Sequence, residues 1–150
     1  GVKKGEPVVM VGHSHGGITG SMLANDPRVR AEFDIPLVIT AGSPIDRHDI
    51  RPDTHVVSFE HTEDFVTGLD GVEWQAKPGM TRVDRTLGES SDPETAAGVG
   101  PVHSHDFPNY IETAELADNH PDLAHTRSWL EAVIPEGEVE TFRFRAEITR

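Results

Sequence analysis

A serine lies at the centre of residues 12–16, which read G-H-S-H-G. This is a G-x-S-x-G motif, in which glycines two residues before and after the serine leave room for a sharp turn from a strand into a helix. The turn holds the serine in a backbone conformation that most residues avoid and exposes its hydroxyl above the end of a sheet. The motif therefore predicts that Ser14 is a nucleophile.

The residues on either side of the motif have the pattern that such a turn requires. Residues 8–11 are V-V-M-V, a short apolar run typical of a strand that is buried on both faces. Residues 18–24 follow with helical spacing. Because the free N–H groups at the start of a helix favour negative charge, we expect the backbone N–H of His15 to be one donor of an oxyanion hole.

Further along the chain, short apolar runs predict an α/β fold. Strands are expected at residues 35–41, 54–59 and 81–87, and helices at 18–24, 106–117 and 121–133. Residues 88–104 are typical of a long loop, and the alternation in residues 142–148 predicts a half-buried edge strand. Because apolar strands alternate with helices, we expect one domain over residues 1–150, with a mainly parallel sheet flanked by helices.

Composition narrows the classes of function. The chain has 150 residues and a net charge of −13, with 26 acidic and 13 basic side chains. This charge disfavours nucleic acids and anionic membrane surfaces as partners. No run approaches the ~18 apolar residues that a membrane helix needs, no signal peptide is visible, and without cysteine there is no thiol chemistry. We expect a soluble protein without stable membrane insertion, and its compartment stays open.

Several segments resemble the α/β-hydrolase superfamily, in particular its lipase- and esterase-like members of the class-3-lipase type. They are residues 9–17 (V-M-V-G-H-S-H-G-G), 39–44 (I-T-A-G-S-P), 56–64, and His105 with Tyr110. The resemblance covers roughly residues 7–115. It implies that the predicted strands are the fifth to eighth of that fold. It also implies hydrolysis of a carboxylic ester or a related acyl bond.

The resemblance also implies an acidic residue in a catalytic triad, because the superfamily places Asp or Glu between the serine and the histidine along the chain. We choose Asp64, just past a buried-type strand at the sheet end where Ser14 is expected. An ionised carboxylate there would orient a histidine and stabilise its charged form. The alternatives are Glu63, Asp46 and Asp70.

His105 is the expected base, because it precedes the rigid helix expected at residues 106–117. His103, two residues away, stays an alternative. His61 is less favoured because it is too near the acid in sequence, and His120 and His125 are expected at the surface. The implied reaction has Ser14 attack the carbonyl while His105 accepts its proton.

Two H-x-H pairs, His13/His15 and His103/His105, could suggest a zinc site. However, His13 and His15 flank a turn built to expose Ser14, and the sequence contains no H-E-x-x-H motif. We expect no metal and no cofactor.

The superfamily's first four strands, and the loop with its second oxyanion donor, precede the nucleophile. This sequence begins with Gly1 and reaches the motif almost at once. We therefore expect the C-terminal part of a larger hydrolase, or a sheet completed by a partner segment or by self-association. The expected ligand is a small-molecule or lipid-like acyl substrate. A catalytically silent binding domain and an acyltransferase with the same triad stay open.

Overall fold

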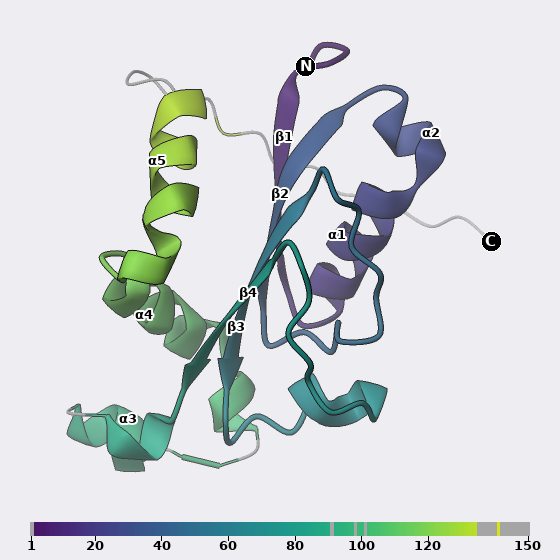
Figure 1. Ribbon diagram of the computed structural model, residues 1–150. Coiled ribbons are helices and arrows are strands. Elements are labelled where there is room, and N and C mark those ends of the chain that lie inside the picture. Colours follow the sequence, from purple (N-terminus) through teal and green to yellow (C-terminus); the bar gives the residue numbers. More distant parts are fainter. Residues whose placement is uncertain (1, 91, 98, 101, 135–140, 142–150) are drawn as a thin grey trace.

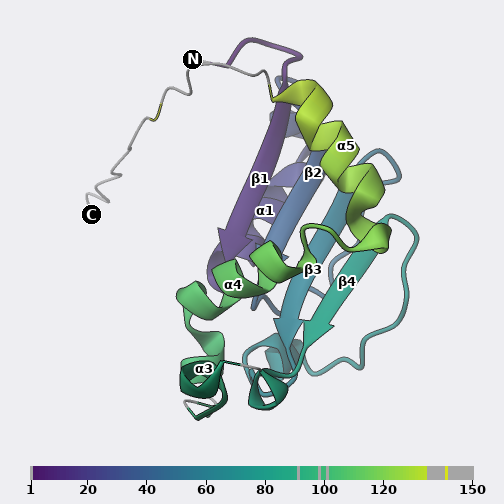
Figure 2. The same ribbon diagram turned by 90° about the vertical axis from the view of Figure 1, so that its left-hand side faces the viewer.

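The computed structural model describes residues 2–90, 92–97, 99–100, 102–134 and 141. Within them, four parallel strands form one sheet in the order β1-β2-β3-β4 (Figure 2). The strands are β1 (Pro7–His13), β2 (Asp34–Ala41), β3 (His55–His61) and β4 (Met80–Arg85). The prediction of an α/β fold with a parallel sheet is confirmed, and each strand lies within a few residues of its predicted position.

Helices cover both faces of this sheet (Figure 1). One face carries α1 (His15–Asn25) and α2 (Pro27–Arg30), and the other carries α4 (Phe107–Ala117) and α5 (Ala124–Val133). The single turn η4 (Pro121–Leu123) joins α4 to α5. Across the described residues, none of the helices has both the length and the apolar character to cross a membrane.

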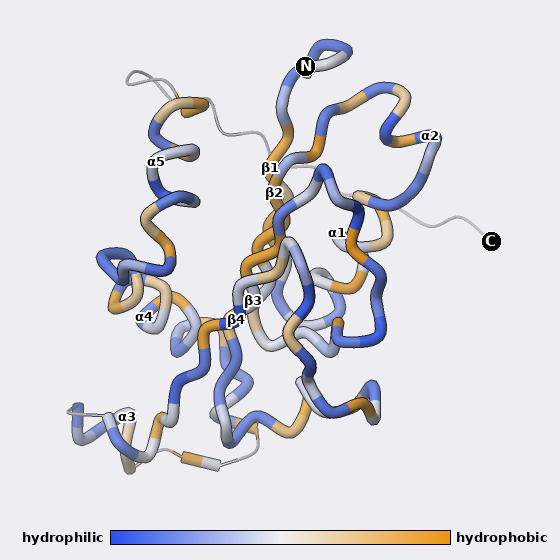
Figure 3. Tube along the Cα trace, viewed as in Figure 1, coloured by the Kyte–Doolittle hydropathy of each residue, from blue (hydrophilic) through white to orange (hydrophobic). Residues whose placement is uncertain are grey.

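The apolar core is divided by the sheet into two clusters. The cluster on the α4 and α5 side contains Leu37, Val57, Phe59, Tyr110, Ala117 and Leu123. The cluster on the α1 side contains Ala24, Ile35, Val38, Ile45 and Val56. Alternation along the strands produces this division, because successive side chains point to opposite faces. Figure 3 shows the apolar residues concentrated along the strands and the polar ones in the connections.

The segment predicted as a long loop, residues 88–104, is more ordered than expected. It contains α3 (Pro93–Ala97), and two single turns lie at its ends, η2 (Leu87–Glu89) and η3 (His103–His105). Proline is favoured in the first turn of a helix, and alanine is the best helix former, so P-E-T-A-A is a reasonable short helix. The connection from β3 to β4 contains a single turn of 3-10 helix, η1 (Thr67–Asp70). The strand predicted at residues 142–148 lies outside the described residues.

The first strand differs from its prediction in burial. In the described part of the chain β1 pairs only with β2, so it forms an edge of the sheet. None of residues 8–11 is buried, and Val11 is 71% exposed. The expectation that this strand is buried on both faces is therefore wrong for the residues described, because no strand covers its outer edge.

A chain of buried polar groups crosses the sheet on its α1 face. The Thr40 hydroxyl donates to Ser58 Oγ (3.1 Å), and Ser58 donates to Glu60 Oε1 (3.1 Å). Arg82 Nη2 lies 3.1 Å from Glu60 Oε2. Glu60 is only 3% exposed, and its burial raises the pKa of its carboxyl from 4.5 to about 7, although Arg82 opposes this shift.

Glu60 should make the stability of the protein depend on pH. The folded chain takes up a proton on Glu60 below about pH 7, whereas the unfolded chain does so only near 4.5. Stability from this group is therefore fully present below pH 4.5 and is lost as the pH rises through about 7. We expect Glu60→Gln to remove this pH dependence, which is worth up to about 3 kcal/mol in the free energy of unfolding. Urea unfolding at pH 5 and pH 8 measures it.

The control for this measurement is Glu131→Gln, the same substitution at an exposed position of α5. It should leave the difference between the two pH values unchanged. Equal pH dependence in the Glu60→Gln variant and the unmodified protein would contradict the raised pKa of Glu60.

Candidate active site

Ser14 lies in the turn between β1 and α1, as predicted. Its backbone has φ 56° and ψ −127°, and no other non-glycine residue in the described ranges has a positive φ. Such a conformation costs about 1–3 kcal/mol and persists only where the surroundings enforce it. The backbone N–H of Ser14 donates to the Ala41 carbonyl (2.9 Å) at the end of β2. The sheet therefore holds the serine in this strained turn.

Close packing around the turn explains one of the two motif glycines. A Cβ on Gly12 would lie 2.3 Å from the carbonyl carbon of Gly16, so only glycine fits there. A Cβ on Gly16 would meet no atom within 4 Å. The expectation that both motif glycines prevent a clash is correct for Gly12 and wrong for Gly16. The second tight position is Gly17, where a Cβ would lie 2.1 Å from Ser43 Oγ, because α1 packs directly on the turn after β2.

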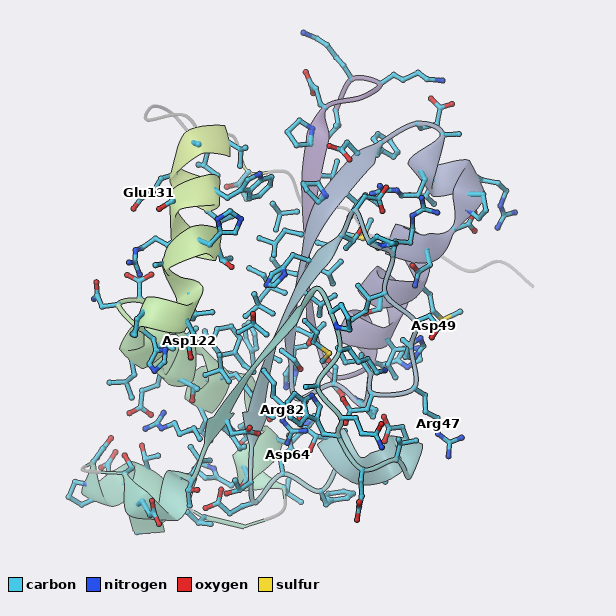
Figure 4. The ribbon with its side chains drawn as sticks, viewed as in Figure 1. Arg47, Asp49, Asp64, Arg82, Asp122 and Glu131 are labelled. Carbon is cyan, nitrogen blue, oxygen red and sulfur yellow. The ribbon has the colours of Figure 1, made fainter. Side chains whose placement is uncertain are left out.

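Asp64 lies three residues past the end of β3, with a side chain that is 0% exposed. Its Oδ1 accepts the backbone N–H of Val66 (2.9 Å), and its Oδ2 accepts the hydroxyl of Tyr110 (2.7 Å). Gly42, with φ +58°, makes room for these groups, because a Cβ there would lie 3.0 Å from Asp64 Oδ2. Figure 4 shows the Asp64 side chain near the carboxyl-terminal ends of the strands.

The structure brings His105 against this carboxylate. His105 Nδ1 lies 2.7 Å from Asp64 Oδ2. Because a carboxylate only accepts hydrogen bonds, Nδ1 carries the hydrogen, and Nε2 of the neutral ring is left with a free lone pair. His105 lies in η3, directly before α4, and its side chain is 21% exposed. The Asp64 carboxylate thus orients the imidazole, whose side chain remains partly exposed to solvent.

Ser14 follows β1, and His105 is bonded to Asp64, which follows β3. Both therefore lie at the edge of the sheet where the carboxyl ends of the parallel strands meet. The ring of His13, next to Ser14 in the chain, lies 4.7 Å from the ring of His105. Between these two described residues, no hydrogen bond joins the Ser14 hydroxyl to His105 in the free chain. Such bonds often tighten only when substrate binds.

The other acidic candidates have different partners. Glu63 accepts the backbone N–H groups of Leu87 and Gly88 (3.1 and 3.0 Å), which shapes the end of β4. Asp70 accepts the backbone N–H of Asp46 (2.9 Å). Asp46 itself is buried 3.8 Å from Arg82, and burial raises its pKa. Among the described residues, none of these three carboxylates is hydrogen-bonded to a histidine.

The other histidines also have structural partners. His103, which is half-buried, pairs with Asp106 (3.2 Å), and His120 pairs with Asp122 (3.7 Å) at an exposed position, while His125 lies in α5. His61 is buried, stacked on Tyr110 with ring centroids 3.8 Å apart. Its Nδ1 donates to the Ser104 carbonyl (2.8 Å), and burial lowers its pKa.

The sequence did not predict that His61 stacks on Tyr110 and donates to the carbonyl of Ser104, the residue before His105. The alternating pattern of β3 could have predicted this position for His61. Extending the alternation of β3 two residues past Phe59 places His61 on the same face as Phe59, toward α4.

The backbone N–H of His15 remains the predicted oxyanion donor. His15 is the first residue of α1, where N–H groups lack partners within the helix. Among the residues that the structure describes, no three histidine, aspartate or glutamate side chains are grouped so that they could hold a metal ion.

Comparison with known proteins identifies no relative of this chain. No family model matches it, and neither a curated protein nor a solved structure gives a significant match. The described residues form an α/β domain with a four-stranded parallel sheet, and its function is inferred from the geometry of the site.

The two motif glycines should respond differently to alanine. Gly12→Ala should lower the free energy of unfolding by roughly 3 kcal/mol or more, because its Cβ would collide with backbone that cannot move away. Gly16→Ala has open space and should change stability by no more than about 1 kcal/mol. Denaturant unfolding of both variants measures the contrast. Equal losses would contradict the described turn.

Proposed function

We propose that this chain is a serine hydrolase that cleaves a carboxylic ester or a related acyl bond through an acyl-enzyme on Ser14. The observation that carries the proposal is the 2.7 Å hydrogen bond from His105 Nδ1 to the buried carboxylate of Asp64. It lies at the sheet edge where Ser14 adopts its strained turn. A nucleophile, a base and a group that orients the base are the parts that such catalysis needs.

Each residue has a definite part in the proposed reaction. Ser14 Oγ attacks the acyl carbon as its proton moves to His105 Nε2, and the C–O bond to the leaving group breaks when that proton is passed to the departing oxygen. Asp64 holds the imidazole and stabilises its positive charge. The His15 N–H stabilises the negative oxygen of the tetrahedral intermediate. Water then attacks the acyl-enzyme by the same proton transfers and regenerates Ser14.

We infer an α/β-hydrolase-like sheet in which β1 to β4 correspond to the fifth to eighth strands of that fold. The parallel order, the strand–turn–helix around Ser14 and the chain order of serine, aspartate and histidine all support it.

Ser14→Ala should abolish hydrolysis of p-nitrophenyl esters and covalent labelling by a fluorophosphonate probe, while circular dichroism and unfolding show an intact fold. Asp64→Asn should lower kcat by about 10³–10⁴-fold, because it no longer holds the neutral ring with its lone pair at Nε2. The matched control is Asp46→Asn, a buried carboxylate on the opposite face of the sheet. It should retain near-normal kcat.

The same measurements distinguish the other functions. Ester turnover that survives Ser14→Ala would refute the proposal. Absence of both labelling and turnover in the unmodified protein would instead support a catalytically silent scaffold. Transfer of the acyl group to an added alcohol or amine, in preference to water, would identify an acyltransferase that uses the same residues.

A further inference from the structure

His13 connects the nucleophile turn to the segment that carries the proposed base. Its Nε2 lies 2.8 Å from the backbone carbonyl oxygen of His105, a residue 92 positions away in sequence. Because a carbonyl only accepts, the Nε2 of His13 carries the hydrogen and donates it. We propose that His13 is a positioning residue that holds His105 in register with Ser14. The proposal rests on the hydrolase function proposed above.

Packing fixes the His13 ring in the orientation that this bond needs. His13 is the last residue of β1, and alternation along the strand directs its side chain toward α4. Its ring centroid lies 5.2 Å from that of Phe107 and 5.8 Å from that of Tyr110, both in α4. These rings pack against part of the half-buried imidazole, which lowers the entropy cost of holding its N–H toward the carbonyl.

The other hydrogen bonds of η3 connect it to β3, α4 and the loop after β3. His105 is bonded through its ring to Asp64. The carbonyl of Ser104 accepts from His61 in β3, and the carbonyl of His103 accepts from Asn109 in α4 (2.8 Å). These bonds place the base relative to the acid, and none of them reaches the nucleophile. Among the described residues, the His13 bond is the side-chain hydrogen bond that ties η3 to the β1–α1 turn.

Without the His13 bond, His105 can remain bonded to Asp64 and still drift away from Ser14. A displacement of about 1 Å between reacting groups can cost about 100-fold in rate. Substrate binding would be little affected, because His13 donates to main chain and does not act on the reacting atoms. The loss should therefore be seen in kcat rather than in KM.

Two substitutions separate the hydrogen bond from the packing of the ring. His13→Phe keeps an aromatic ring and removes the donor, and we expect kcat for p-nitrophenyl esters to fall about 10- to 100-fold with KM within about twofold. His13→Gln places an amide N–H at a similar reach and should recover most of the loss. The matched control is His55→Phe. It removes a histidine bonded to Thr81 Oγ1 (3.1 Å) at the far end of β3 and should leave kcat unchanged.

A measurement without substrate tests the bond independently of catalysis. In NMR spectra of the ¹⁵N,¹³C-labelled protein, the Nε2–H proton of His13 should give a slowly exchanging imidazole signal. The carbonyl carbon of His105 should shift in the His13→Phe variant and return toward its original position in His13→Gln. This readout applies even if the protein hydrolyses no ester, so failure of the proposed function and failure of this inference can be told apart.

If the protein is an active enzyme, the kcat values of the two variants decide the inference. A kcat that falls in His13→Phe and recovers in His13→Gln supports the inference. An unchanged kcat in His13→Phe, or an equal loss in both variants, overturns it. If the unmodified protein neither turns over esters nor reacts with the probe, the hydrolase function fails. The NMR signals then decide the inference alone. A slowly exchanging Nε2–H signal of His13, with a His105 carbonyl shift in His13→Phe, supports His13 as the residue that holds His105, and absence of both overturns it.

Discussion

The buried carboxylate of Asp64 organises the edge of the sheet where the candidate site lies. Its side chain is fully enclosed, and it accepts hydrogen bonds from Val66, Tyr110 and His105. An ionised group removed from water is costly unless such bonds replace its hydration. The carboxylate therefore requires donors from the loop after β3, from α4 and from η3. In meeting that requirement, these segments place an imidazole beside the turn that carries Ser14.

Tyr110 shows how one core residue serves both stability and the site. Its ring belongs to the apolar cluster on the α4 side and stacks on the buried ring of His61. Its hydroxyl donates to Asp64 and accepts the backbone N–H of His61 (3.3 Å). Burial and the adjacent carboxylate both raise the pKa of the phenol, so it remains a donor at neutral pH. The apolar core and the polar site are thus joined through a single side chain.

The two faces of the sheet have different polar networks. On the α4 face, the polar groups come together at Asp64 and His105. On the α1 face, the chain from Thr40 to Glu60 ends at Arg82, which also lies 2.7 Å from the exposed Asp84. Arg82 offsets only part of the cost of burying Glu60, which explains why the pKa of the Glu60 carboxyl stays high. The strain in the Ser14 turn and the buried carboxyl of Glu60 are both maintained by the surrounding packing.

Local patterns in the sequence predicted the main strands and helices and indicated Ser14 as the candidate nucleophile. The run at residues 8–11 and the G-x-S-x-G motif were sufficient to predict β1, the turn and α1, because strand periodicity and glycine requirements act over a few residues. The resemblance in chain order limited the acid and the base to residues after Ser14. Asp64 and His105 were then selected over Asp46 and His103 from their positions after a predicted strand and before a predicted helix. Their hydrogen bond depends on loops that meet only in the folded chain. Only the tertiary structure revealed that Gly17 rather than Gly16 is tightly packed, that His61 supports the site and that His13 reaches the carbonyl of His105. Each of these contacts joins residues that are far apart in sequence and become adjacent only when the carboxyl ends of the strands, η3 and α4 come together in the folded chain.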